Sequence, residues 1–371
     1  MSRSIFEEVG DQTPQEPLVV PGAADARKRR NRTLIALWLL LLAAMVAAQI
    51  LVGGATRLTD SGLSITEWRP VTGAIPPMSE AAWEAELQKY RGTTEYQEQN
   101  AGMSLAEFKV IYWWEWGHRQ WGRLIGLVFA AGFAWFYFRK IIPAGWTGRL
   151  LLVGGLGALQ GAIGWWMVAS GLVGRLDVSQ YRLAVHLTLA FIILAFLLWF
   201  ALSLRRDERF LLQARRRRES GLLKLGGGLA LLLMLQIVMG AFVAGLDGGM
   251  VYNQWPKIGD GWLLPTGEAF TPFDSGTAAQ AVHRLLGYLV LIAMAAFWWV
   301  ARRSPHARTR AWAGYLGLAA LAQVVIGIAT LTHAAALPLG LLHQAGAVAL
   351  LAVLILTKHQ AAYPEEERIA A

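Results

Sequence analysis

The sequence contains no cysteine among its 371 residues. Disulfide bonds, thiolate metal sites and cysteine nucleophiles are therefore excluded. The seven histidines are consequently the only side chains that we expect to bind a transition metal strongly.

Charge is also scarce, since only 16% of the residues are Asp, Glu, Lys or Arg, against about 25% in ordinary soluble proteins. Hydrophobic residues make up 55% of the chain and gather in long runs, which is typical of bilayer-spanning helices. The net charge of +9 could indicate a nucleic-acid partner. The basic residues lie in short segments between apolar runs, however, and this pattern favours membrane orientation over nucleic-acid binding.

Eight apolar segments each approach the roughly 20 residues that a bilayer requires. These predicted spans cover residues 33–52, 108–138, 150–170, 181–204, 222–246, 278–300, 312–332 and 339–357. The fold class is therefore an all-α integral membrane protein. Basic residues at 27–32 and at 205–218 fall on one side of the membrane, so the positive-inside rule places both termini in the cytoplasm.

The predicted spans divide the chain into two halves. The expected units are a cytoplasmic tail at 1–32 (disordered over 1–26), a first half at 33–204, a linker at 205–220, a second half at 221–357 and a cytoplasmic tail at 358–371. The first half carries a long outer loop at 53–107. Ser79 is expected to begin a short helix there, and Ser104 with Glu107 forms a capping-box pattern that opens the second span. The loop at 247–276 is either a folded cover over a site or a plain connector.

The two halves repeat five features in the same order. Gln-x-x-x-Gly at 49–53 recurs at 236–240, 187 positions later, and Trp68 recurs as Trp255 at the same offset. The other three pairs are His118-Arg119 with His283-Arg284, Gln160-x-x-x-Gly164 with Gln323-x-x-x-Gly327, and His186 with His343. We therefore predict two tandem four-helix bundles related by a pseudo-two-fold axis along the membrane normal. The glycines allow close approach of a neighbouring helix or of a flat ligand.

Four histidines occupy corresponding positions in the repeats, namely His118, His186, His283 and His343. The spans that carry them run in the same direction, so the two histidines of each half share a depth. Two imidazoles at one depth on facing helices can ligate a haem iron from both sides. A single histidine in a span is as often a structural group, but the duplicated pairing favours ligation. We expect His306 and His359 to be solvated and His333 to be a loop or cap residue.

Arginines lie next to the histidines: Arg119 and Arg284 follow them directly, and Arg123 is one turn further on. A guanidinium binds carboxylates in a bidentate manner, and haem carries two propionates. We therefore predict that these three arginines bind propionates. The alternative is that they extend to the membrane surface.

Glu115 lies three residues before His118 and so shares its helical face, whereas the second half has Gln280 at the equivalent position before His283. A carboxylate beside one haem can take a proton or stabilise positive charge that develops on the porphyrin. The difference predicts a reactive first half with Glu115 as a catalytic residue, and an electron-transfer or structural haem in the second half. The alternative is that Glu115 only pairs with Arg119 one turn on.

With these motifs the sequence resembles the haem A synthase family. The resemblance covers residues 33–357 and includes the stretch Leu58-Thr-Asp-Ser-Gly-Leu-Ser-Ile-Thr-Glu-Trp-Arg-Pro70 after the first span. It implies oxidation of a methyl group of haem O to a formyl group, which gives haem A for cytochrome oxidase assembly. His118 and His186 would then ligate the substrate haem, His283 and His343 a haem b, and Glu115 would assist catalysis.

The chain looks like the proteobacterial and mitochondrial branch of that family, which implies a bacterial inner membrane as its location. Some members have a cysteine pair in the first outer loop, and any thiol role is excluded here because the chain has none. The resemblance also implies transient contact with the enzyme that makes haem O and with an electron acceptor. From the distribution of basic residues we expect no nucleic-acid partner, and a homo-oligomer is possible.

Iron held by two imidazoles has no free position for dioxygen. We therefore expect that electrons are removed from the porphyrin system and that water supplies the oxygen to the methyl carbon. Two such steps give a hydrated aldehyde, which loses water. Glu115 would act as a base or as a charge stabiliser.

Two other functions fit parts of the pattern. A two-haem membrane cytochrome could relay electrons from quinol, with Glu115 as the proton acceptor. A transporter with duplicated halves would bind no pigment.

Overall fold

A computed structural model describes residues 22–365. Eight of its helices are long and apolar enough to cross a membrane, which confirms the predicted number. They are α1 (Ala23–Leu58), α4 (Leu105–Phe138), α5 (Thr147–Val168), α6 (Gln180–Leu204), α8 (Ser220–Gly245), α9 (Gly276–Ala301), α10 (Ala307–Thr332) and α11 (Leu337–Ala362). The described residues include no strand, so the all-α class is confirmed for this part of the chain.

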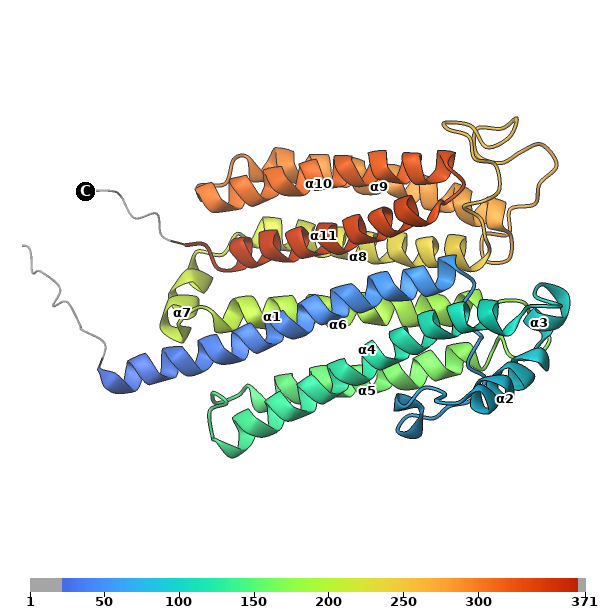
Figure 1. The fold of residues 1–371 in the computed structure, drawn as a ribbon. Coiled ribbons are helices and arrows are strands. Elements are labelled where there is room, and N and C mark those ends of the chain that lie inside the picture. Colours follow the sequence, from blue (N-terminus) through green and yellow to red (C-terminus); the bar gives the residue numbers. More distant parts are fainter. Residues whose placement is uncertain (1–21, 366–371) are drawn as a thin grey trace, which may run out of the picture.

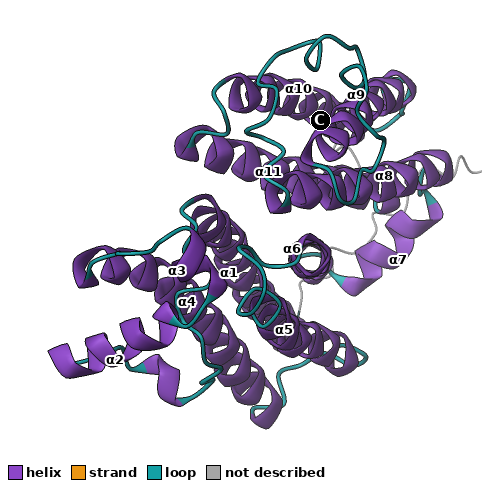
Figure 2. Cartoon of the chain, turned by 90° about the vertical axis from the view of Figure 1, so that its right-hand side faces the viewer, coloured by secondary structure: helices purple, strands orange, loops and turns teal. Residues whose placement is uncertain are grey.

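The eight long helices form two groups of four, which Figure 2 shows end-on. In the first group α1, α4, α5 and α6 each contact the next, and α6 closes the ring against α1. The helices α8, α9, α10 and α11 form the second ring in the same way. Between the rings α1 packs on α11 and α6 packs on α8, while α6 and α11 also touch. A two-fold rotation that takes α1 to α8 and α6 to α11 converts the α1–α11 contact into the α6–α8 contact. The contacts between the rings therefore agree with the predicted pseudo-symmetry.

The interface between the rings is part of one hydrophobic core that runs through both halves. Buried aliphatic side chains from the two groups meet there, including Leu39 of α1, Leu197 of α6, Leu233 of α8 and Leu354 of α11. Half of the most apolar segment of α1 and of α6 is buried, against 6% in α4 and 11% in α5, which leave apolar side chains on an outer surface. The two halves therefore share one hydrophobic core.

One end of the molecule, the loop end, carries the long connections at 59–104 and 246–275 (Figure 1). The first connection contains η1 (Thr72–Ala74), α2 (Glu80–Arg91) and α3 (Thr94–Glu98). Ser79 caps α2, and Ser104 with Glu107 forms a reciprocal capping box on α4, so both predicted helix starts are confirmed. Aromatic side chains hold α2 on α4 and form a small separate core: Trp83, Tyr90, Phe108 and Tyr112.

A buried carboxyl group lies in this small domain. Glu95 of α3 is only 2% exposed, and the hydroxyl of Tyr90 donates to it at 3.1 Å. Burial raises the pKa of Glu95 from 4.5 to about 8, and the negative charges of Asp177, Glu115 and Asp60 act in the same direction. Glu95 therefore carries a proton in the folded protein at neutral pH.

Glu95→Gln is expected to raise thermal stability at pH 8 but not at pH 5. The folded protein keeps the proton on Glu95 up to about pH 8, whereas the unfolded chain releases it near 4.5, so rising pH favours unfolding between these values. Glutamine cannot ionise and removes this loss. The melting temperature of the variant minus that of the wild type should grow by about 2 °C or more from pH 5 to pH 8. An equal difference at both pH values would contradict the assignment.

The opposite end, the linker end, carries the connection at 205–219 and both ends of the described chain (Figure 1). The predicted linker contains a helix that we did not expect, α7 (Glu208–Arg216). It exposes Phe210 and Leu212 beside several arginines, a pattern typical of helices that lie in a membrane interface.

Helix ends at this side differ from the prediction. Helix α1 begins at Ala23, so the basic cluster at 27–32 is helical, and residues 1–21 of the predicted tail lie outside the described part. Helix α11 continues to Ala362, and the expectation that His359 is solvated is wrong. His359 is 1% exposed and packs on Trp199 of α6 at a ring distance of 5.2 Å, because α11 still contacts α6 at this position.

Candidate functional site

The four predicted ligand histidines lie in the halves of their helices that begin at the loop end. His118 is on α4 and His186 on α6, and their equivalents His283 and His343 are on α9 and α11. In each ring the two helices that carry histidines are separated by helices that do not, so each pair faces across its bundle. His333, by contrast, is the exposed C-cap residue of α10, as predicted.

Each histidine ring packs against the glycine of a Gln-x-x-x-Gly motif on the neighbouring helix. A Cβ atom added at Gly53 would lie 3.0 Å from Nε2 of His118, and one at Gly164 would lie 3.0 Å from Cε1 of His186. Gly240 and Gly327 are equally close to the other two rings, at 3.0 Å from His283 and 2.8 Å from His343. Any side chain at these four positions would displace an imidazole.

The glutamines of the same motifs bind the same histidines. The Gln49 amide donates to the backbone oxygen of His118 at 3.0 Å, and the Gln236 amide lies 3.2 Å from Nε2 of His283. The amides of Gln160 and Gln323 donate to the backbone oxygens of their histidines. The Gln160 amide nitrogen also lies 3.2 Å from both ring nitrogens of His186, and that of Gln323 lies 3.2 Å from Nδ1 of His343. The glutamine of each motif therefore contacts its histidine either at the ring or at the backbone oxygen.

The molecule therefore repeats one unit four times: a helix with Gln-x-x-x-Gly followed by a helix with histidine. The sequence showed the motifs and the histidines as separate features. The signal was present in the order of the chain, since each Gln-x-x-x-Gly segment precedes one of the four histidines. The structure shows that every such segment contacts the histidine that follows it.

The pair in the second half has the spacing that a shared iron requires. Metal–nitrogen bonds of about 2.0 Å, with about 1.1 Å from each nitrogen to its ring centre, place two opposed imidazole centres about 6 Å apart. The ring centres of His283 and His343 are 6.3 Å apart. This ring spacing is compatible with one iron between the two side chains, so His283 and His343 would be the residues that hold a haem in the second half.

Glu115 is buried and fully hydrogen-bonded. One carboxylate oxygen accepts from the Ser64 hydroxyl and from the Ile65 backbone amide, each at 2.7 Å. The other accepts from Nε and Nη2 of Arg119 at 3.1 and 2.5 Å. The pairing with Arg119 that the sequence offered as an alternative is therefore present, and the carboxylate also holds the first outer loop.

Arg119 and Arg123 bind the backbone of the same loop. Arg119 donates to the oxygens of Ile65 and Glu67, and Arg123 donates to those of Arg69 and Pro70. In the second half Arg284 does the same, donating to the oxygens of Tyr252 and Lys257 and to the Gln280 side chain. Each of the three arginines thus donates at least two hydrogen bonds to loop backbone, a role that the sequence did not suggest.

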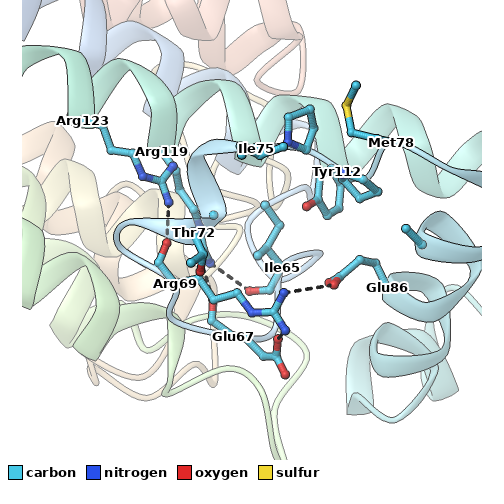
Figure 3. Close-up of a pocket in the computed structure, with 14 residues that line it drawn as sticks. Ile65, Glu67, Arg69, Thr72, Ile75, Met78, Glu86, Tyr112, Arg119 and Arg123 are labelled. Atoms are coloured by element: carbon cyan, nitrogen blue, oxygen red, sulfur yellow. Dashed lines mark hydrogen bonds and ion pairs between the residues drawn. The ribbon is translucent and has the colours of Figure 1, made fainter.

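A cavity of about 230 Å³ lies at the loop end, where residues 65–78 run between α2 and α4 (Figure 3). Arg119 and Arg123 line it together with the ion pairs that Arg69 makes with Glu67 and Glu86. None of the four histidines is among its lining residues. The cavity therefore lies between the first connection (59–104) and α4, and it is separate from the histidine pairs.

Known proteins are similar to this sequence over nearly its whole length. The family model described as Cytochrome oxidase assembly protein, COX15-CtaA, matches residues 36–355. A relative named Heme A synthase from Paracoccus denitrificans is 48% identical, with 99% of this chain and 98% of the relative aligned. Proteins of the same name from Jannaschia sp. and Ruegeria pomeroyi are each 50% identical, with 98% of this chain and 97% of each relative aligned. The chain, with its duplicated bundles and paired histidines, belongs to the COX15-CtaA family of cytochrome oxidase assembly proteins.

Proposed function

We propose that this protein is a haem A synthase, which oxidises a methyl group of haem O to a formyl group for cytochrome oxidase biogenesis. The observation that carries the proposal is the histidine pair in each of two equivalent bundles, with the second pair at the spacing of two axial ligands. The near full-length similarity to proteins named Heme A synthase supports it. An electron-relay cytochrome is not favoured by these relatives.

His118 and His186 hold the substrate haem in this proposal, and His283 and His343 hold a haem b. The support is the packing of all four rings on glycine and glutamine, which fixes each imidazole before a ligand arrives. Haem b supplies a one-electron carrier when it is bound. Contacts of Arg119, Arg123 and Arg284 with propionates stay a prediction, and they would use the guanidinium donors that the loops leave free.

Water is the proposed source of oxygen, because His118 and His186 would both bind the substrate haem and would leave no position there for dioxygen. In balance, one methyl group and one water give one formyl group, four protons and four electrons, and the electrons pass to an external acceptor. The protein must therefore hold the porphyrin, admit water and accept protons. The predicted role of Glu115 as a base requires its carboxylate to release one of the four hydrogen bonds that it accepts.

The proposed location is a bacterial inner membrane with both termini in the cytoplasm. The linker end carries arginines on α1, on α7 and after α9, which matches the cytoplasmic excess of positive charge. The histidine pairs then lie toward the outer surface. Proposed partners are lipid, the enzyme that supplies haem O and an electron acceptor.

Purification of the protein from cells that make haem O tests the function. We expect a pigment spectrum of low-spin haem, and extraction should yield haem b together with hydroxymethyl or formyl haem. Haem b alone would indicate electron relay, and a colourless protein would overturn both. A preparation from cells without haem O serves as the control and should contain haem b only.

A further inference from the structure

The loop end of each bundle is closed by an equivalent backbone segment. We name residues 61–69 the first strap and residues 248–256 the second strap, since they are related by the offset of 187 that also relates Trp68 to Trp255. Glu115 and Arg119 hold the first strap, and Gln280 and Arg284 hold the second. Each strap is thus fixed by the residue three before a ligand histidine and the residue directly after it.

The first strap crosses its bundle. Leu63 packs with Val168 of α5 and with Val178 in the connection to α6. Trp68 stacks on Trp165 of α5 with ring centres 5.9 Å apart, and Trp165 follows the glycine that contacts His186. The strap therefore bridges α4 and α5 at the end of the bundle where His118 and His186 lie.

One peptide bond of each strap faces its helix in the opposite direction in the two halves. In the first, the N–H of Ile65 points to the Glu115 carboxylate at 2.7 Å. In the second, the carbonyl oxygen of Val251, from the equivalent peptide bond, accepts from the Gln280 amide at 2.7 Å. The peptide is thus turned over, and Tyr252 has a φ of 51°, a conformation that Ile65 does not adopt. An acid faces a donor in one half, and an amide faces acceptors in the other.

We propose that Glu115 is a positioning residue, which holds the first strap closed over the His118–His186 site by accepting hydrogen bonds from Ser64 and Ile65. The difference between Glu115 and Gln280 then reflects the orientation of one peptide bond rather than a reactive and an inert haem. The part that concerns haem A formation rests on the proposed function.

Glu115→Gln should release the first strap. Glutamine has a single acceptor oxygen, so its NH₂ group would face either the donors of Ser64 and Ile65 or the guanidinium of Arg119. This donor–donor conflict disappears only if the peptide bond between residues 64 and 65 turns over, as in the second strap. That change would place Ile65 at positive φ, which a β-branched residue resists.

Asparagine adopts positive φ more readily than isoleucine. Ile65→Asn combined with Glu115→Gln should therefore allow the turned-over peptide and restore the strap, with glutamine donating to the carbonyl of residue 64. Ile65→Gly is a second rescue variant, in case asparagine disturbs the packing of residue 65. Ile65→Asn alone, with Glu115 retained, is the matched control for the lost isoleucine side chain.

The experiment measures hydrogen exchange of peptides that cover 61–69, and haem A formed, in the full-length purified variants. Glu115→Gln should speed exchange in the first strap about tenfold or more and lower haem A by a similar factor, because it loses hydrogen bonds to a charged group. In the double variant, the exchange rate of the first strap and the amount of haem A should each return to within about threefold of the Ile65→Asn control. The low-spin spectrum of the second haem should be the same in all variants.

Two results would overturn the proposal. Unchanged exchange in Glu115→Gln would show that Glu115 does not hold the strap. Restored exchange without restored haem A would show that the carboxylate itself takes part in the chemistry, as the base that the sequence suggested. If the wild type formed no haem A, the proposed function would fail while the exchange data still decided whether Glu115 holds the strap.

The second half provides an internal control. Gln280→Glu would set a carboxylate against the backbone oxygens of Gly248 and Val251, which now accept from the Gln280 amide at 2.7 Å each. Exchange should rise in the second strap and remain unchanged in the first. Faster exchange in both straps would indicate general unfolding and would contradict a local role for these residues.

Discussion

His118→Ala and His186→Ala are each expected to abolish haem A formation and to leave the haem of the second half in place. Alanine cannot bind iron, so each variant lacks one of the two side chains that would hold the substrate haem. Loss of an outer-shell partner of a ligand typically costs 10–100-fold in affinity, so we expect loss of the ligand itself to lower haem A by about 100-fold or more. The His283–His343 pair lies in the other bundle and keeps its contacts with Gln236 and Gln323.

The measurement is chromatography of extracted haems with the absorption spectrum of the purified protein. His283→Ala and His343→Ala should give the reciprocal result, with loss of haem b. His333→Ala is the control, because His333 is exposed at the end of α10 and outside both pairs. Loss of all haem from a single first-half variant would show one shared site and would refute the assignment of two sites.

Gly240→Leu is expected to prevent haem binding in the second half. The first side-chain atom at this position would already lie 3.0 Å from the His283 ring, so the rest of a leucine must displace the imidazole. Leucine has a higher helix propensity than glycine by about 1 kcal/mol, and a weaker helix therefore cannot explain the loss. Gly164→Leu should act in the same way on His186 and lower haem A while haem b remains.

Control glycines lie on the same helices. A Cβ atom at Gly228 of α8 or at Gly157 of α5 would meet nothing within 4 Å, so Gly228→Leu and Gly157→Leu should retain haem b and haem A. The haem content per protein, measured by absorption, distinguishes each variant from its control. Equal haem content in Gly240→Leu and Gly228→Leu would show that the close contact with His283 is not needed for binding.

Much of the architecture was predictable because membrane helices leave strong signals. Eight apolar runs of bilayer length, the fixed offset between motifs and the position of each histidine predicted the helices, the duplication and the shared depth of the histidine pairs. Helix starts at Ser79 and Ser104 were predictable because capping is local. The prediction for His359 was wrong because its environment depends on α6, which is distant in sequence.

The sequence by itself determined which residues are paired by the repeat and that Glu115 has glutamine as its equivalent. Only the tertiary structure decided what each residue touches: that every Gln-x-x-x-Gly segment contacts the next histidine, and that the arginines hold loop backbone. The physical reason is that helical periodicity and hydropathy are local, whereas the direction of a peptide N–H or C=O depends on φ and ψ in an irregular loop. That direction makes an acid suitable at position 115 and an amide suitable at position 280.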